Sequence, residues 1–256
     1  MKSRVELTRL TLTSPRLLSE ERLLILADLH QQTRREYADE WLAVDPTAIL
    51  IPGDWVEGRE RTRGRAQTLS LLRQLSEQCP VFYSLGNHEL GLRGNRLPLG
   101  ECTERSAISD DVAGLPAELT DCGVQLLCNR YVRFHSLCIG GLTPAGGGML
   151  DAAWQQDMMH EDGFRLLLCH HPEYYEPYVR RYSLDLTVAG HAHGGQWRFF
   201  GQGIYAPGQG LFPRYTSGFY NEQRLLVSRG LAGRFPFPRL FNKRQAILLT
   251  LLPETQ

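Results

Sequence analysis

Five short apolar segments, each followed at once by polar residues, constrain the fold of this chain more than any other feature of its sequence. These segments are residues 23–27, 48–51, 81–85, 166–169 and 184–189. The first four are nearly continuous apolar runs, which are typical of strands covered on both faces, and the fifth also carries Asp185 and Thr187. We therefore expect strands from the interior of a layered α/β fold.

The segments between these strands have the character of helices. They are residues 34–44, 63–78, 116–122, 152–159 and 174–182. The repeated order of strand and helix predicts α/β layers. Further strands are expected among glycine-rich and aromatic loops, at residues 137–142, 224–228 and 246–252. These later strands predict a second sheet packed on the first.

Length and charge fit a single enzyme domain that spans residues 1–256. A chain of 256 residues can bury a large core, and no segment resembles a linker. The 28 basic and 28 acidic residues give a formal net charge of zero, so no specific nucleic-acid binding is expected. The sequence has neither a signal-peptide pattern nor a run of about 20 apolar residues, which predicts a cytoplasmic protein.

Each apolar segment leads into a motif rich in side chains that bind metal ions. The motifs are ADLH with Asp28 and His30, PGDW with Asp54, GNHE with Asn87 and His88, CHHP with His170, and GHAH with His191 and His193. Because functional crevices of α/β sheets lie beyond the carboxyl ends of the strands, five strand ends can bring these side chains together. Carboxylate, amide and imidazole groups without thiolates favour Mn²⁺, Fe or Zn²⁺. Two such ions and a nucleophilic water indicate phosphoester hydrolysis.

The ordered motifs D-x-H, GD, GNHE, His before Pro and GHxH resemble those of the calcineurin-like metallophosphoesterase superfamily, over about residues 23–196. The later segments PGQGLFPRY, SGFY, LLVSRGLAG and PRLFN further resemble the small bacterial phosphodiesterase branch with the GH[TA]HGGQ motif. The chain departs from that branch at Ala192, where threonine is usual, and at residues 243–245, where Arg-Pro-Glu is expected. With the two expected sheets, the resemblance implies the α/β class, a four-layer α-β-β-α sandwich of two mixed sheets flanked by helices.

The resemblance also implies a role for each motif residue. A first metal ion would be bound by Asp28, His30 and His193. A second would be bound by Asn87, His170 and His191. Asp54 would bridge the two ions, which share a hydroxide held for in-line attack on phosphorus. His88 would contact the phosphoryl oxygen or protonate the leaving group. The implied cofactors are two divalent metal ions, Mn²⁺ first, with Fe or Zn²⁺ as alternatives.

Two neighbours of the motif residues have less defined roles. His171 follows the expected ligand His170, and we favour a supporting or structural role for it over direct metal binding. Glu89 follows His88 and either orients a ligand or is an acidic residue at the start of a helix. His135 and His160 lie outside every motif and receive no functional role.

The substrate is less constrained by the sequence. Four arginines follow Asp54, namely Arg59, Arg61, Arg63 and Arg65. They would either bind a phosphate or form the solvated start of a helix, and we slightly favour the helix start. Aromatic and leucine residues of the C-terminal third would line an acyl or nucleobase pocket or, as we favour for most of them, pack in the core. They are Leu211, Phe212, Tyr215, Phe219, Tyr220, Phe235, Phe237 and Phe241. Residues 90–129 are expected to form a lid or cap loop.

The leading hypothesis is a dinuclear metal-dependent phosphoesterase. It would hydrolyse a phosphodiester or pyrophosphate bond in a small-molecule substrate, either lipid-linked or a nucleotide. A protein phosphatase or phosphomonoesterase is the enzymatic alternative, although the first motif reads ADLHQQ where that branch has GDxHG. A non-catalytic metal-binding scaffold is the third hypothesis, but such relatives lose ligands that are all present here. A peripheral membrane or lipid contact and the oligomeric state are left open.

Overall fold

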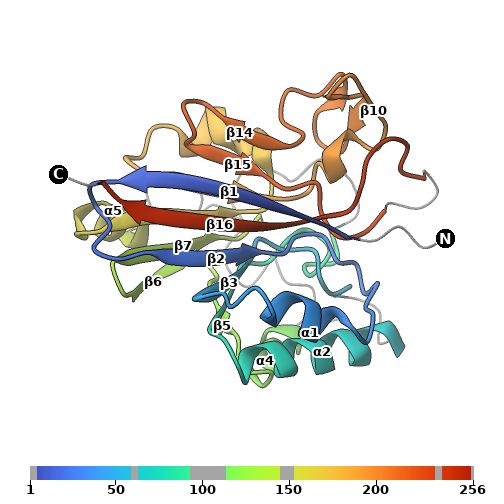
Figure 1. The fold of residues 1–256 in the computed structure, drawn as a ribbon, viewed down its shortest axis with the longest axis horizontal. Coiled ribbons are helices and arrows are strands. Elements are labelled where there is room, and N and C mark those ends of the chain that lie inside the picture. Colours follow the sequence, from blue (N-terminus) through green and yellow to red (C-terminus); the bar gives the residue numbers. More distant parts are fainter. Residues whose placement is uncertain (1–4, 59–62, 93–113, 145–152, 234–237, 255–256) are drawn as a thin grey trace.

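Two six-stranded sheets form the centre of the computed structural model, which describes residues 5–58, 63–92, 114–144, 153–233 and 238–254 (Figure 1). The first sheet has the strand order β1-β16-β2-β3-β4-β5. Its strands are β1 Glu6–Ser14, β16 Gln245–Pro253, β2 Glu21–Ile25, β3 Ala48–Ile51, β4 Val81–Tyr83 and β5 Gln125–Leu126. The second sheet has the order β14-β15-β9-β8-β7-β6. Its strands are β14 Gly218–Tyr220, β15 Leu225–Val227, β9 Leu186–Ala189, β8 Phe164–Cys169, β7 Leu137–Leu142 and β6 Arg130–Phe134.

Both sheets are mixed. In the first, β2 to β5 run parallel to one another, and β16 is antiparallel to β2 but parallel to β1. In the second, β7, β8, β9 and β15 run parallel, with antiparallel β6 and β14 at the two edges. Parallel strands place their carboxyl ends at the same edge of a sheet, so the segments after β2, β3 and β4 lie side by side.

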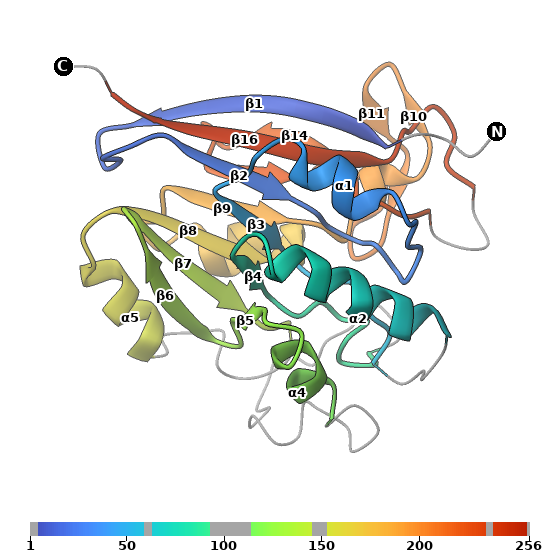
Figure 2. The same cartoon turned by 60° about the horizontal axis from the view of Figure 1, so that its bottom comes forward.

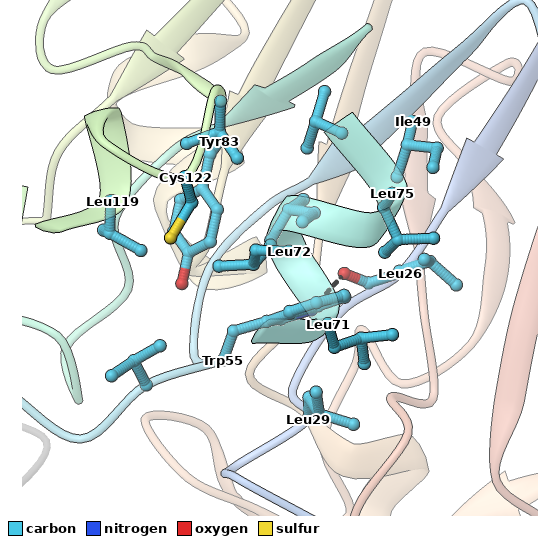
Figure 3. Packing of buried hydrophobic residues seen from close by; sticks show 14 of the residues in the cluster. Leu26, Leu29, Ile49, Trp55, Leu71, Leu72, Leu75, Tyr83, Leu119 and Cys122 are labelled. Carbon is cyan, nitrogen blue, oxygen red and sulfur yellow. Dashed lines mark hydrogen bonds between the residues drawn. The ribbon is translucent and has the colours of Figure 1, made fainter. Parts of the chain in front are cut away.

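Alternating side chains in the strands of the first sheet fill two separate cores. On β2, Leu23 and Ile25 pack between the two sheets, whereas Leu24 packs on the outer face of the first sheet. Three helices cover that outer face, namely α1 Tyr37–Leu42, α2 Arg63–Ser76 and α4 Leu115–Thr120 (Figure 2). Figure 3 shows Leu71, Leu72 and Leu75 of α2 packed near Trp55, whose indole N–H donates to the carbonyl of Leu26 at 2.8 Å.

A third core lies on the outer face of the second sheet. It is covered by α5 Ala153–His160, by the 3-10 helix η3 Pro172–Tyr174 and by the π-helix η4 Tyr175–Val179. Helices outside, two sheets inside and one core between the sheets make four layers, so the expected fold class is confirmed. Within the described ranges, no helix is both long enough and apolar enough to span a bilayer.

Some expectations for individual elements were wrong. The single helix expected at residues 174–182 is two short non-α helices, because Pro177 has no N–H for an α-helical hydrogen bond and Arg180 N donates instead to Tyr175 O, five residues back. Strand β1 was not expected, because its side chains alternate between half-buried and exposed and its sequence is not a continuous apolar run. Residues 114–126 belong to α4, β5 and the core rather than to a lid, while 93–113 lie outside the described residues.

Candidate metal centre

The motif residues follow five strands of the two sheets. Those of the first sheet follow the adjacent strands β2, β3 and β4, and those of the second follow the adjacent strands β8 and β9. Two contacts join the sheets at this edge. The N–H of His191 donates to Oδ1 of Asp28 at 2.9 Å, and Nδ1 of His170 donates to the carbonyl of Pro52 at 2.8 Å. The structure therefore brings the motif residues of both sheets to one place.

Asp54 lies at the centre of this group and is buried. Its Oδ2 is 3.0 Å from Nε2 of His170, 3.8 Å from Nε2 of His30 and 3.9 Å from Nε2 of His88. Its Oδ1 accepts a hydrogen bond from the backbone N–H of His88 at 2.9 Å. Burial on its own would raise the pKa of Asp54, but the imidazoles of His170, His88 and His30 outweigh it and hold this pKa well below its ordinary value. Asp54 is thus an ionised carboxylate between imidazoles of the two sheets.

One side of the centre consists of Asp28, His30 and His193, whose potential ligand atoms all lie within 4.8 Å of one another. Nε2 of His193 is 3.3 Å from Nε2 of His30 and 3.9 Å from Oδ1 of Asp28. Nδ1 of His193 faces the carbonyl of Ala232 at 3.3 Å. Burial lowers the pKa of His193 well below its ordinary value, so the ring is neutral. With the proton on Nδ1, the Nε2 lone pair is free for a metal ion.

The other side contains His170, His171 and His191, again with potential ligand atoms within 4.8 Å of one another. Nδ1 of His170 donates to a backbone carbonyl, which directs Nε2 toward Asp54. Nδ1 of His171 donates to Oε1 of Glu173 at 3.1 Å, and its buried Nε2 has no hydrogen-bond partner among the described residues. His171 therefore offers a further nitrogen within 4.8 Å of the ligand atoms of His170 and His191.

Buried polar atoms without partners test whether this donor set fits metal ions. Oδ2 of Asp28, Oδ1 of Asn87 and Nε2 of His191 are buried and have no hydrogen-bond partner in the described part of the chain. Each such atom costs about 1–3 kcal/mol if nothing contacts it. These atoms are lone-pair donors, and divalent cations would satisfy all three. The carboxylate, amide and imidazole groups present thus fit two divalent metal ions.

The backbone of the centre is strained. Five motif residues have positive φ angles, namely Asp28 at 53°, His30 at 46°, Asp54 at 58°, His191 at 63° and His193 at 47°. The left-handed region costs about 1–3 kcal/mol for residues other than glycine, and such residues concentrate at functional sites. The strain turns each side chain toward the centre directly after its strand.

Two glycines permit a close approach of the loops after β3 and β4. Gly53 has a φ of 109°, and a Cβ at this position would lie 2.6 Å from the backbone nitrogen of Gly86. A Cβ on Gly86 would lie 2.2 Å from Oδ1 of Asp54. These contacts give a physical reason for the glycines at positions 53 and 86, because any larger residue would displace Asp54.

Glu57 contacts two motif histidines, a role that we did not expect from the sequence. Both of its carboxylate oxygens are 2.8 Å from Nδ1 of His88, and Oε1 is 3.3 Å from Nδ1 of His30. Burial acts to raise the pKa of Glu57, but hydrogen bonds from the two imidazoles lower it to about 2. Burial likewise acts to lower the pKa of His88, and the carboxylates of Asp54 and Glu57 raise it to about 9. The available signal was an acidic residue three positions after Asp54.

Glu89 anchors the loops that carry Asp54 and His88. Its buried carboxylate accepts backbone hydrogen bonds from four residues and one from a phenol, namely Asp54 at 2.9 Å, Trp55 at 2.6 Å, Val56 at 3.1 Å, Gly86 at 2.8 Å and the Tyr83 hydroxyl. Residues 88–91 form a turn and not a helix. Of the two roles considered for Glu89, the geometry supports the positioning of a ligand.

The sequence also suggested residues that would contact the substrate. Arg65 is buried, pairs with Glu118 at 3.0 Å and is therefore not free to bind phosphate. The remaining arginines of that segment cannot be placed, because Arg59, Arg61 and the Arg63 side chain lie outside the described residues.

The aromatic and leucine residues of the C-terminal third divide into buried and exposed ones. Tyr215 is buried, and Phe219 and Tyr220 are half-buried. Leu211, Phe212 and Phe241 are exposed, so the expected core packing was wrong for these three. Phe235 and Phe237 also lie outside the described residues.

Known proteins resemble this chain over the region that contains the centre. A family model described as calcineurin-like phosphoesterase matches residues 21–195. The phosphodiesterase YaeI of Escherichia coli (strain K12) is 27% identical over 228 residues, covering 84% of this chain and 76% of that protein. The uncharacterized protein YpbG of Bacillus subtilis (strain 168) is 22% identical over 213 residues, covering 81% and 72%. The solved structure of Pseudomonas putida nuclease MPE covers 78% of each chain with 17% identity and a TM-score of 0.34.

Proposed function

Because the chain belongs to the calcineurin-like phosphoesterase family and is a hydrolase, we propose that it hydrolyses a phosphodiester or pyrophosphate bond with the help of two divalent metal ions. The position of Asp54 carries this proposal. Its Oδ2 lies 3.0 Å from His170 of one histidine group and 3.8 Å from His30 of the other. A single carboxylate between two groups of metal-binding side chains is the arrangement that a dinuclear centre needs.

The proposed ligand sets are those given by the motifs. The first ion would be held by Asp28, His30 and His193, the second by Asn87, His170 and His191, and Asp54 would contact both. When bound, the two ions would polarise the phosphoryl oxygens and supply a nucleophilic water at neutral pH. Asp54 keeps its charge under these conditions because nearby imidazoles lower its pKa. His171 provides a further nitrogen beside the second set.

His88 is the proposed general acid. Its side chain is 35% exposed and can therefore reach a substrate, while its Nε2 lies 3.9 Å from Asp54. Glu57 binds the opposite nitrogen, Nδ1, and so fixes both the direction of the ring and its protonated form. Nε2–H of His88 would donate its proton to the leaving oxygen as the bond to phosphorus breaks. Glu57 acts through His88 and is a positioning residue.

A diester is the preferred substrate class in this proposal. The phosphodiesterase name of the YaeI relative supports a diester over a monoester. Manganese is our first choice of ion, because the donor set combines hard oxygens with imidazoles and has no thiolate. A lipid-linked substrate and a nucleotide both satisfy this chemistry.

The test is hydrolysis of bis(p-nitrophenyl) phosphate and of p-nitrophenyl phosphate, with and without Mn²⁺. We expect metal-dependent turnover that favours the diester. Asp54→Asn should abolish turnover, and His88→Ala should lower kcat by about 10²- to 10⁴-fold for diphenyl phosphate, whose leaving group needs the proton, and by less for bis(p-nitrophenyl) phosphate. The matched controls are Asp39→Asn, an exposed carboxylate on α1, and His160→Ala, an exposed histidine on α5. Both controls should retain wild-type activity.

Other results would favour the alternative functions. A preference for the monoester would indicate a phosphomonoesterase, and rapid turnover of a phosphopeptide would indicate a protein phosphatase. Bound metal without hydrolysis of any of these esters would favour a non-catalytic scaffold. Wild-type activity in Asp54→Asn would contradict the proposed metal centre directly.

A further inference from the structure

Exposed apolar side chains gather on the loops that follow the last metal-binding motif. We define the aromatic loop surface as six residues with their exposed fractions, Phe199 at 43%, Phe200 at 109%, Leu211 at 70%, Phe212 at 70%, Leu240 at 45% and Phe241 at 75%. They belong to two small hairpins, β10 Arg198–Phe199 with β11 Gln202–Gly203 and β12 Tyr205–Ala206 with β13 Gly210–Leu211, and to residues 240–241. Figure 1 shows the first hairpin at one end of the molecule, around β10.

Hydrogen bonds hold these three segments together. The N–H of Arg198 donates to the carbonyl of Leu240 at 3.0 Å, and Nε2 of Gln202 donates to the carbonyl of Pro213 at 3.1 Å. The rings of Phe199 and Phe241 are in edge contact, with centroids 5.5 Å apart. The three segments that carry the six side chains therefore lie side by side.

Three phenylalanines of this surface also have an unfavourable backbone conformation. The φ angles are 49° at Phe200, 51° at Phe212 and 52° at Phe241. A bulky residue is strained in this left-handed region, which glycine and asparagine tolerate. Exposure of a large ring to water adds a second unfavourable contribution at the same three positions. Neither contribution stabilises the isolated chain. These rings therefore indicate a surface that contacts another molecule.

The charge around these rings is positive. Residues 196–218 and 238–245 contain five basic and no acidic residues, namely Arg198, Arg214, Arg239, Lys243 and Arg244. The Arg214 and Lys243 side chains are 65% and 73% exposed. Carboxylates from outside these segments offset part of this charge, because Glu176 is 3.4 Å from Arg214, Glu6 is 3.6 Å from Lys243, and Glu173 lies against Gly208. The segments themselves still contribute five cations and no carboxylate to a chain with zero net charge.

We propose that the aromatic loop surface docks on an anionic lipid bilayer. Rings on separate turns can each enter the interface of a fluid bilayer, which needs no pocket of matching shape. The surrounding cations would contact anionic headgroups. Anionic lipid therefore satisfies both the apolar and the charged features of this surface. This inference concerns binding and goes beyond the proposed hydrolysis.

The aromatic loop surface is connected to the candidate metal centre by hydrogen bonds. Nδ2 of Asn242, the neighbour of Phe241, donates to the carbonyl of His193 at 2.7 Å and to that of Gln196 at 3.1 Å. The short helix η5 His193–Gly195 leads directly into the first hairpin. A docked molecule would thus hold its metal centre beside the headgroups. In combination with the proposed function, this position favours phosphoesters of lipid headgroups as substrates.

The test is flotation with vesicles of phosphatidylcholine alone or mixed with phosphatidylglycerol. The main variant is Phe200→Asn with Phe212→Asn and Phe241→Asn, because asparagine tolerates the left-handed conformation. Its control is Leu18→Asn, which replaces an 86% exposed leucine in the turn between β1 and β2, far from β10 in Figure 1. We expect the wild type and Leu18→Asn to float with phosphatidylglycerol vesicles, and the triple variant to bind at least about tenfold more weakly.

Three further results are expected if the surface binds lipid. Arg214→Gln with Lys243→Gln should weaken binding to phosphatidylglycerol vesicles by about fivefold for each cation. The triple variant should have an unchanged or raised Tm, because strain is relieved, and should hydrolyse the soluble diester at the wild-type rate. If the protein floats with the vesicles but hydrolyses no phosphoester, only the proposed function fails and the docking proposal stands.

Three results would overturn the docking proposal. They are absence of wild-type flotation, equal flotation of the triple variant, and reversible dimerisation of the wild type that the triple variant lacks. Sedimentation equilibrium without vesicles measures the last of these and would instead assign the surface to contact between two copies of the chain.

Discussion

Both carboxylate oxygens of Glu57 lie 2.8 Å from Nδ1 of His88, on the side of the ring opposite the nitrogen that faces Asp54. Glu57→Gln keeps the size of the side chain and removes the charge that favours the protonated imidazole. We expect kcat to fall by about 10- to 100-fold, as for other residues that orient a functional group. The decrease should be larger for diphenyl phosphate than for bis(p-nitrophenyl) phosphate, because phenolate is the poorer leaving group and needs the proton more. An equal decrease for both diesters would contradict the positioning of a general acid.

The coupling of Glu57 to His88 can be measured separately. If Glu57 acts through His88, the variant with both Glu57→Gln and His88→Ala should be no slower than His88→Ala alone. Metal content, measured on the same samples, distinguishes loss of the acid from loss of an ion, since Glu57 also contacts His30. Fully additive effects on kcat would mean that Glu57 acts independently of His88.

The close approach at Gly53 predicts a steric effect beyond backbone strain. Gly53 and Gly201 both have positive φ angles, 109° and 84°, but only a Cβ at Gly53 meets other atoms, with Gly86 N at 2.6 Å. Gly53→Ala should therefore lose metal binding and activity, whereas Gly201→Ala should lose only about 1 kcal/mol of stability, because nothing lies within 4 Å of its added Cβ. Thermal unfolding and diester hydrolysis of both variants provide the comparison. Similar activity in the two would show that the loop after β3 adjusts freely.

The hydrogen bonds accepted by Glu89 predict a large loss of stability when its carboxylate is replaced by an amide. Glu89→Gln replaces an acceptor of backbone and phenol hydrogen bonds by an amide that turns one N–H group toward other donors. We expect a loss of about 3 kcal/mol or more, or a Tm lower by about 6–12 °C. Glu222→Gln, at an exposed position, should leave the Tm unchanged. A Tm close to that of the wild type for Glu89→Gln would mean that the loops do not depend on this anchor.

The ion pair between Glu6 and Arg229 predicts a pH-dependent contribution to stability. Their charged atoms are 2.7 Å apart, and the hydrogen bond from Arg229 lowers the pKa of Glu6 below its ordinary value. A lowered folded-state pKa gives stability that is present above the unfolded-state pKa and lost as the pH falls through the folded-state pKa. Because Glu6 is partly exposed, Glu6→Gln should lower the Tm at pH 7 by only about 1–3 °C. This difference should vanish in acid; a constant difference would exclude the ionic contribution.

The sequence predicted the strands and the candidate ligands that depend on local patterns. A continuous apolar run predicted β3 with its observed bounds, and the strand expected among the glycine-rich loops at residues 137–142 is β7 with the same bounds. Asp28 and Asp54 were expected at strand ends, and the structure brings them to one buried centre. These expectations depend only on the spacing of residues along the chain and on the fact that parallel strands end at the same edge.

Features that depend on contacts between distant segments were not predictable in this way. The role of Glu57 requires the loops after β2, β3 and β4 to meet, and no local pattern shows that its carboxylate faces His30 and His88. The aromatic residues after η5 have an ordinary core composition, and the exposure of Phe212 and Phe241 follows from turns that place them outside the second sheet. Hydrophobic composition alone does not distinguish a core residue from one on a binding surface.

Metal content per chain is the most direct test of the proposed dinuclear centre. Purified wild type and Asp54→Asn would be equilibrated with Mn²⁺, separated from free ions by gel filtration and analysed by inductively coupled plasma mass spectrometry, with Asp39→Asn as the control. We predict two ions per chain in the wild type and the control, and a clear decrease in Asp54→Asn. Two ions retained by Asp54→Asn, or at most one bound by the wild type with any of Mn²⁺, Fe²⁺ and Zn²⁺, would contradict a centre bridged by Asp54.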